Sequence, residues 1–266
     1  MWITVGQAES WRVPNSEVRV AVLPPSPQVS WRMQQSRGQR VARADATWEN
    51  HCMTEQPRLA RTFVFLGDSV TDCGRQQDEA HLGFGYVRLI AEHFAAHEPA
   101  SRVLNRGVSG ERTKDLRARF DTDCLDLDPD VITIYIGVND TWRRYDRNDP
   151  TCDADFEADY RYMLDQLSAT QPSAPVLMVV PFVADIDQEK ARFHEDLDGK
   201  VAVIRALAHE FQHSVVDLEA VLDQAWRDGH TPETIAQDGI HPTMAGHRLI
   251  ADAWLKAFAT VEHTSR

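Results

Sequence analysis

The sequence predicts an α/β fold in which helices cover both faces of a parallel sheet. Short apolar runs alternate with amphipathic segments of helical period from Arg61 onward. The apolar runs are continuous, which is typical of parallel strands that are buried on both faces. The 266-residue chain is 42% hydrophobic and 26% charged, so it can bury a sizeable core.

The first half of this pattern supplies two strands and two helices. Thr62–Leu66 (TFVFL) is an apolar run that ends at a glycine, and Val103–Asn105 is a shorter strand before a glycine-rich turn. Gly85–His97 has apolar residues at helical spacing, and Arg112–Phe120 is a charged helical segment. Loops at the carboxyl ends of such strands are where open α/β sheets bind ligands.

The second half continues the alternation. Val131–Ile136 (VITIYI) is rich in β-branched residues and is the clearest strand. Val176–Val180 (VLMVV) is a strand that Pro181 closes, and Ser214–Leu218 is the last strand. Helices are expected at Asp153–Thr170, Gln188–Gln212 and Met244–Ala259.

Residues 1–57 differ from the rest of the chain. They contain a PPSP run, scattered arginines and no sustained period, so we expect them to be disordered. Met53 opens a natural start for the domain that follows, so this extension could be a start-site artefact. The alternative is a regulatory or docking arm. We expect the folded domain to span residues 58–262.

Charge and cysteine content narrow the possible partners and the compartment. Lys and Arg total 28 against 41 Asp and Glu, and a net charge of -13 repels nucleic acid and anionic lipid. No apolar run reaches about 18 residues, so no membrane span is expected. The four cysteines form no CxxC pair, and we see no export signal, so we predict a cytoplasmic protein.

Three short motifs follow predicted strands. Ser69 in GDS stands where a nucleophile needs to be, and its backbone N–H can face a developing oxyanion. Gly110 in GVSGE offers a free N–H and close backbone approach, and Asn139 in GVND offers a side-chain donor. Taken alone, GDS and the Gly110 motif are better explained as turns, and Asn139 has an alternative role in an Asx turn or a helix N-cap.

A fourth motif, DGIHP, places Asp238 three residues before His241. A serine nucleophile needs a base, and the base needs a carboxylate that fixes its tautomer. Together with Ser69, Gly110 and Asn139, this pair completes a nucleophile, a base, an orienting carboxylate and three oxyanion donors. No GxSxG elbow is present, which argues against an ordinary α/β-hydrolase.

This set of motifs resembles the SGNH (GDSL) hydrolase family over about Thr62 to Phe258. Flanking stretches look like its intracellular acetylxylan (xylo-oligosaccharide) esterases: GDSVTDCGR, LGFGYV, NRGVSGERTKDLRARF, GVNDTWRRYD and DGIHPTMAGHRLIADAWL. The resemblance implies a three-layer α/β/α sandwich with a parallel sheet of about five strands. It also implies ester hydrolysis through an acyl-serine, with no metal or organic cofactor, and assembly into a homo-oligomer.

By the same resemblance, Ser69 is the nucleophile, His241 the base and Asp238 its partner. The oxyanion hole consists of the N–H groups of Ser69 and Gly110 and the side chain of Asn139. One residue departs from the pattern, because Gln237 stands where the xylan esterases are expected to carry an aromatic residue.

Four residues are candidates for binding the acylated small-molecule substrate, which we expect to be a carbohydrate. Trp142 and Arg143 suit a sugar face and its hydroxyls, although a solvated helix start with a half-buried tryptophan explains them equally well. Asp68 directly precedes Ser69, and Gln237 directly precedes the triad aspartate. Nearby, Asp72 and Arg75 could pair and brace the serine turn.

Three alternatives remain open at this point. A lysophospholipase or thioesterase would keep the mechanism and take longer acyl chains. A zinc metallopeptidase is the second alternative, because His209 and His213 match its HExxH pattern at the end of a long predicted helix. A catalytically silent carbohydrate-binding protein is disfavoured because no triad member is missing.

Overall fold

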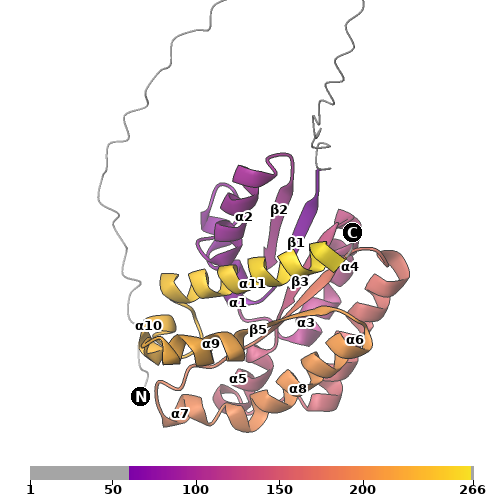
Figure 1. Ribbon diagram of the computed structural model, residues 1–266. Coiled ribbons are helices and arrows are strands. Elements are labelled where there is room, and N and C mark those ends of the chain that lie inside the picture. The colour runs from indigo at the N-terminus through magenta and orange to yellow at the C-terminus, as the bar shows by residue number, and fades with distance from the viewer. Residues whose placement is uncertain (1–59, 265–266) are drawn as a thin grey trace, which may run out of the picture. The chain divides into compact units, whose positions relative to one another are not determined.

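A five-stranded parallel sheet forms the centre of the computed structural model, which describes residues 60–264 (Figure 1). The strand order is β2-β1-β3-β4-β5, so the chain reverses its direction of travel across the sheet at β1. The carboxyl ends of β1 and β3 therefore meet at a topological switch point, the place where open α/β sheets bind ligands. The strands are β1 (Thr62–Gly67), β2 (Arg102–Gly107), β3 (Val131–Tyr135), β4 (Val176–Val180) and β5 (Ser214–Asp217).

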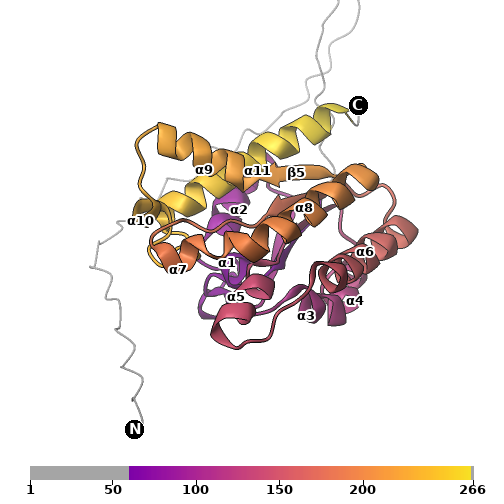
Figure 2. The same ribbon diagram turned by 90° about the horizontal axis from the view of Figure 1, so that it is seen from below.

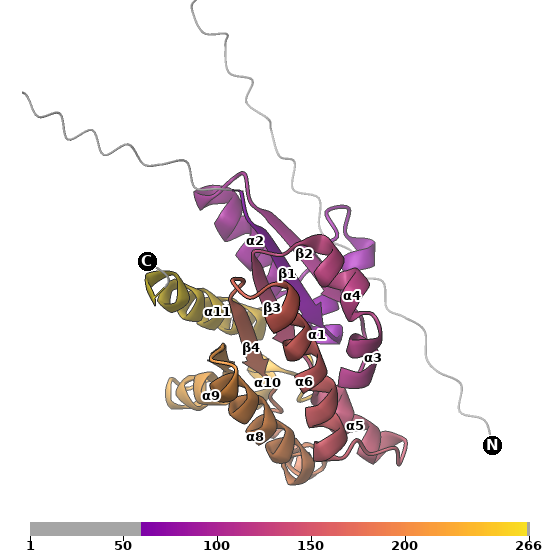
Figure 3. The same cartoon turned by 90° about the vertical axis from the view of Figure 1, so that its right-hand side faces the viewer.

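Helices cover both faces of this sheet. One face packs against α2 (Tyr86–His97), α9 (Leu218–Arg227) and α11 (Met244–Thr264). The other face packs against α3 (Thr113–Ala118), α4 (Phe120–Asp123), α6 (Asp153–Thr170) and α8 (His194–Glu210). Figures 2 and 3 show α9 and α11 on the opposite side of the sheet from α3 and α6. The predicted three-layer sandwich is confirmed.

The short elements lie in the connections. They are α1 (Ser69–Asp72), η1 (Arg75–Gln77), η2 (Leu125–Leu127), α5 (Val138–Asp146), α7 (Gln188–Ala191) and α10 (Pro232–Ile235).

Strand β3 shows why its sequence reads as a continuous apolar run. Ile132 and Ile134 pack on the side of α6 and α8, whereas Val131 and Tyr135 pack on the side of α2 and α11. Successive strand side chains point to opposite faces, so both faces demand apolar residues. The one polar member, Thr133, accepts a 2.8 Å hydrogen bond from the indole of Trp254.

The predicted helix boundaries need three corrections. The segment Gln188–Gln212 is not one helix, because α7 ends at Ala191 and α8 begins at His194. Phe193 at the break is fully buried and stacks on Tyr145 with ring centroids 4.6 Å apart. The segment 112–120 is divided between α3 and α4, and α11 continues beyond residue 259 to Thr264.

The predicted disorder of residues 1–57 lies outside the described residues, and the 58–262 domain boundary stays a prediction. Within residues 60–264, no helix has both the length and the apolar character needed to cross a bilayer.

Candidate active site

The loop after β1 presents Ser69 at the carboxyl edge of the sheet. Asp68 caps α1 by accepting a 3.0 Å hydrogen bond from the N–H of Val70, and Ser69 is the first helical residue. The preceding Gly67 has no room for a side chain, since a Cβ there would lie 2.3 Å from the Thr71 hydroxyl oxygen. This close packing fixes the point at which the chain turns and where the serine emerges.

The structure brings Ser69, His241 and Asp238 together in hydrogen-bonding order. Ser69 Oγ lies 2.9 Å from His241 Nε2, and His241 Nδ1 lies 2.6 Å from Asp238 Oδ2. The other carboxylate oxygen, Oδ1, accepts backbone N–H groups from Ile240 at 3.0 Å and His241 at 2.7 Å. The aspartate accepts every one of these bonds, so Nδ1 of His241 carries the proton and Nε2 is free to accept one.

His241 and Asp238 each stabilise the charged form of the other. The hydrogen bond to Asp238 raises the pKa of His241, against the opposing effect of burial. Burial acts to raise the pKa of Asp238, but hydrogen bonds from the His241 ring and from two backbone N–H groups outweigh it and lower that pKa. The site can therefore hold a proton on the imidazole while the carboxylate stays ionised.

Asn139 and Gly110 stand on the loops that flank the serine. β2 and β3 are the two neighbours of β1, so their following loops border the loop that carries Ser69. Asn139 is 2% exposed and its Nδ2 donates to the backbone carbonyl of Glu111 at 3.1 Å, which joins the two flanking loops. Gly110 is exposed, with φ at +85°. That backbone conformation favours glycine.

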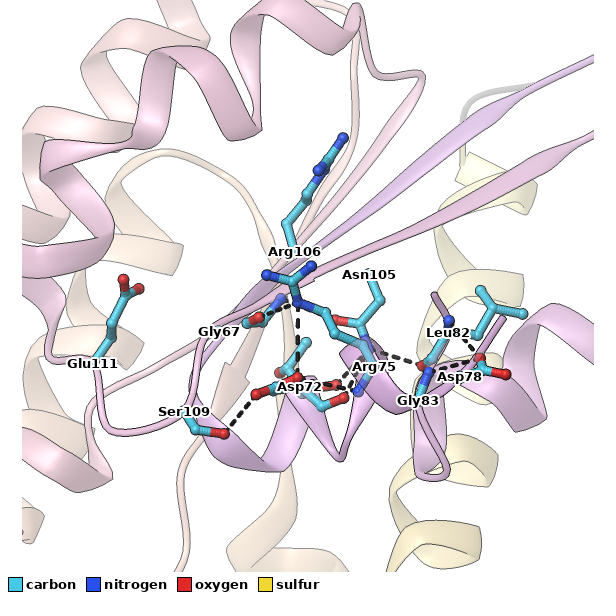
Figure 4. Close-up of polar contacts among 12 residues, drawn as sticks. Gly67, Asp72, Arg75, Asp78, Leu82, Gly83, Asn105, Arg106, Ser109 and Glu111 are labelled. Atoms are coloured by element: carbon cyan, nitrogen blue, oxygen red, sulfur yellow. Dashed lines mark hydrogen bonds and ion pairs between the residues drawn. The ribbon is translucent and has the colours of Figure 1, made fainter. Parts of the chain in front are cut away.

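A network of polar contacts ties the Gly110 loop to the serine helix (Figure 4). Ser109 Oγ donates to Asp72 Oδ2 at 2.6 Å, and Arg75 Nε donates to the carbonyl of Gly107 at 2.6 Å. Asn105 Nδ2 donates to the carbonyls of Thr71 at 2.6 Å and Leu82 at 2.8 Å. The expected pairing of Asp72 with Arg75 is present at 3.7 Å.

The four predicted substrate-binding residues have different surroundings. The ring centroid of Trp142 lies 5.8 Å from that of His241, and Gln237 is exposed next to Asp238. Asp68 is 1% exposed and is held as the cap of α1 by its bond from the Val70 N–H. The Arg143 side chain is 12% exposed and donates to Asn139 Oδ1 at 3.0 Å.

Two carboxyl groups close to the site are buried: Asp68, which the sequence suggested as a substrate contact, and Asp140, which it did not single out. Burial raises the pKa of Asp68 to about 7 and that of Asp140 to about 6. Asp140 Oδ2 accepts bonds from the Thr113 N–H at 3.0 Å and hydroxyl at 3.1 Å, which joins α5 to α3. The contact between Arg143 and Asn139 has a signal in the sequence, because the two residues have the i,i+4 spacing of helix neighbours.

The HExxH pattern does not form the helical arrangement that a zinc protease needs. α8 ends at Glu210, so His213 lies beyond it, and Glu210 pairs with Arg161. Among residues 60–264, the group whose ligand atoms are close enough to hold a metal ion is His194, Asp198 and Glu219, which includes neither HExxH histidine. The metallopeptidase alternative thus has no geometric support in the described part of the chain.

A serine, a histidine and an aspartate at the carboxyl edge of a parallel sheet define a serine-hydrolase type of site. Comparison with known proteins agrees. The profile of the GDSL-like lipase/acylhydrolase family matches residues 65–249. An acetylxylan esterase from Geobacillus stearothermophilus is 32% identical over 210 residues, which are 73% of this chain and 92% of that protein. The chain belongs to the GDSL-like lipase/acylhydrolase family, and it is a carboxylic ester hydrolase with the SGNH fold.

Solved structures give the same assignment. A GDSL-like lipase from Parabacteroides merdae superposes with a TM-score of 0.70 at 29% identity, covering 76% of this chain and 98% of that one. A variant of Axe2, an acetyl xylan esterase from Geobacillus stearothermophilus, gives 0.66 at 30% identity, covering 74% and 94%. In Axe2, alanine variants of a serine, an aspartate and a histidine are described as catalytic mutants. A tryptophan directly precedes that aspartate.

Proposed function

We propose that this esterase removes acetyl groups from carbohydrates such as xylo-oligosaccharides, and that the acetyl group passes through an ester on Ser69. The observation that carries the proposal is the hydrogen-bonded chain from Ser69 Oγ through His241 to Asp238. In Axe2, the aspartate and histidine of the catalytic mutants are also three residues apart. That spacing supports the same roles for Asp238 and His241.

The chemistry follows from the tautomer. Nε2 of His241 takes the hydroxyl proton as Ser69 Oγ attacks the acetyl carbonyl, and the bond pair of that carbonyl moves to its oxygen. His241 then gives the proton to the departing sugar oxygen, so the acetyl group remains on the serine. In the second half, His241 removes a proton from water, which attacks the carbonyl of the acetyl-serine. Acetate leaves, and Ser69 Oγ regains its hydrogen from His241.

The negative oxygen formed in each half needs donors. We assign them to the backbone N–H groups of Ser69 and Gly110 and to the second hydrogen of Asn139 Nδ2, whose first hydrogen is committed to Glu111. Loss of one such donor lowers kcat by roughly a hundredfold to a thousandfold in other serine hydrolases.

Two observations support a sugar substrate, and one difference from the relatives bears on it. The related proteins are named acetylxylan esterases, and Trp142 offers an aromatic face next to His241. Gln237 stands where Axe2 has a tryptophan, so a flat stacking surface is missing at that position. We expect Gln237→Trp to raise kcat/KM on acetylated xylo-oligosaccharides more than on an aryl acetate.

The test is acetate release from acetylated xylose and xylo-oligosaccharides. Wild type should release acetate, Ser69→Ala should not, and Ser168→Ala should match wild type. Ser168 is a suitable control because, among the residues that the structure describes, its hydroxyl bonds within α6, to the carbonyl of Leu164 at 2.9 Å. Equal rates for wild type and Ser69→Ala would refute the nucleophile assignment.

A series of aryl esters of increasing chain length tests the acyl preference. A maximum at acetyl supports the deacetylase proposal, and a maximum at long chains would replace it with the lysophospholipase or thioesterase alternative. A homo-oligomer and a cytoplasmic location stay predictions, which light scattering and cell fractionation can test.

A further inference from the structure

We propose that Arg143 is a positioning residue for Asn139: it fixes which end of the Asn139 amide faces the oxyanion, and it does not bind substrate. This inference rests on the proposed function, in which Asn139 is an oxyanion donor.

Arg143 and Asn139 lie one turn apart on α5. The guanidinium Nη2 donates to Asn139 Oδ1 at 3.0 Å, and Asn139 Nδ2 donates to the carbonyl of Glu111 at 3.1 Å. With Asn139 only 2% exposed, water does not compete for these groups. Both polar atoms of the amide therefore have a fixed partner.

The two partners select the same orientation. An amide has nearly the same shape after its oxygen and nitrogen are exchanged, so packing alone does not set its direction. Arginine has donors and no acceptor, so it can pair only with Oδ1. In the flipped state, the amide nitrogen would face the Arg143 donors and Oδ1 would face the Glu111 carbonyl oxygen. The selected state leaves the second Nδ2 hydrogen for the oxyanion.

Arg143 is itself held in place. Its Nη1 pairs with the carboxylate of Asp146, and its guanidinium carbon lies 5.4 Å from the centroid of the Trp142 ring. The side chain is 12% exposed. Turning it towards a bound sugar would break the bond to Asn139 and leave a nearly buried oxygen unpaired, which is costly. Substrate contact and the observed bond are thus alternatives, and the geometry favours the bond.

A double-mutant cycle on aryl acetate hydrolysis tests this role independently of the sugar preference. Asn139→Ala should lower kcat about a hundredfold or more. Arg143→Met should lower kcat about tenfold, because Glu111 still biases the amide, and should change KM less than about twofold. In the Asn139→Ala background, Arg143→Met should change kcat less than about twofold, because no amide remains to be oriented.

Two further variants separate positioning from general damage. Arg143→Lys can still donate to Oδ1, so its kcat should lie nearer to wild type than that of Arg143→Met. Arg117→Met is the matched control, since Arg117 likewise pairs with a carboxylate, Asp159 at 2.7 Å, and stacks on a ring, Tyr162 at 4.3 Å. It should keep wild-type kcat. Thermal unfolding of every variant monitors the fold.

The outcomes are distinct. An equal loss from Arg143→Met with and without Asn139, or a loss confined to KM, overturns the positioning role. Should Arg143→Met not fold, Arg143→Lys is measured in both backgrounds, and an equal loss in the two again overturns the role. An unchanged kcat in Asn139→Ala instead refutes the oxyanion assignment of the proposed function.

Discussion

Asp238→Asn should lower kcat about ten-thousandfold while leaving the protein folded, as expected when the catalytic histidine is held in the wrong tautomer. The two carboxylate oxygens of Asp238 have different partners. Oδ1 accepts the backbone N–H groups of Ile240 and His241, and Oδ2 accepts the His241 ring. An asparagine has only one oxygen for these three donors.

The two backbone donors decide how that asparagine will sit. Keeping both bonds, at 3.0 and 2.7 Å in the wild type, places the new NH₂ group against Nδ1 of His241. Nδ1 must then accept, so the ring proton moves to Nε2 and faces Ser69 Oγ. A protonated Nε2 cannot take the serine proton. A ten-thousandfold loss corresponds to about 5.5 kcal/mol of transition-state stabilisation.

The assay is aryl acetate hydrolysis with thermal unfolding as the check on folding. Asp165→Asn, an exposed change on α6, is the matched control and should retain wild-type kcat. A kcat for folded Asp238→Asn within tenfold of wild type would refute the tautomer argument and the role of Asp238.

Three more predictions concern pH and the oxyanion loop. Activity needs an unprotonated Nε2, so kcat/KM should rise with pH through the pKa of His241. The hydrogen bond to Asp238 raises that pKa, so the midpoint of the rise should lie above about 6.5. A midpoint below about 6 would contradict this. Ser109→Ala removes the 2.6 Å bond to Asp72 and should lower kcat about fivefold with little change in thermal stability; unchanged kcat would show that this bond does not place the loop. Gly110→Ala places a side chain at φ +85°, where the new Cβ meets no atom within 4 Å. Urea unfolding should therefore show that the free energy of unfolding falls by about 1–2 kcal/mol from backbone strain alone. A fall above about 3 kcal/mol would mean that strain is not the only cost.

The strands could be predicted from sequence because the burial pattern dictates them directly. β3 and β4 are buried on both faces, and a nearly continuous apolar run meets this demand. The break between α7 and α8 could not be predicted, since no proline or glycine marks it. It arises where Phe193 packs on Tyr145, a contact between residues far apart in the chain.

The candidate site was predictable where local turns place its residues. Ser69 and the Asp238–His241 pair depend on short loops at strand and helix ends, and their spacing carries the geometry. The surroundings of Asp68 and Arg143 depend on tertiary packing. Their positions in the sequence suggest substrate contacts, but they do not reveal that Asp68 is 1% exposed or that Arg143 donates to Asn139.

The role of Ser69 as nucleophile is tested by identifying the residue that carries the acetyl group during turnover. Aryl acetate hydrolysis by the wild type is quenched with acid, the protein is digested, and peptide fragments are mapped by mass spectrometry. One acetyl group is expected on Ser69, and none is expected in Ser69→Ala. Turnover with Ser69 unmodified and the acetyl group on another residue would contradict this role.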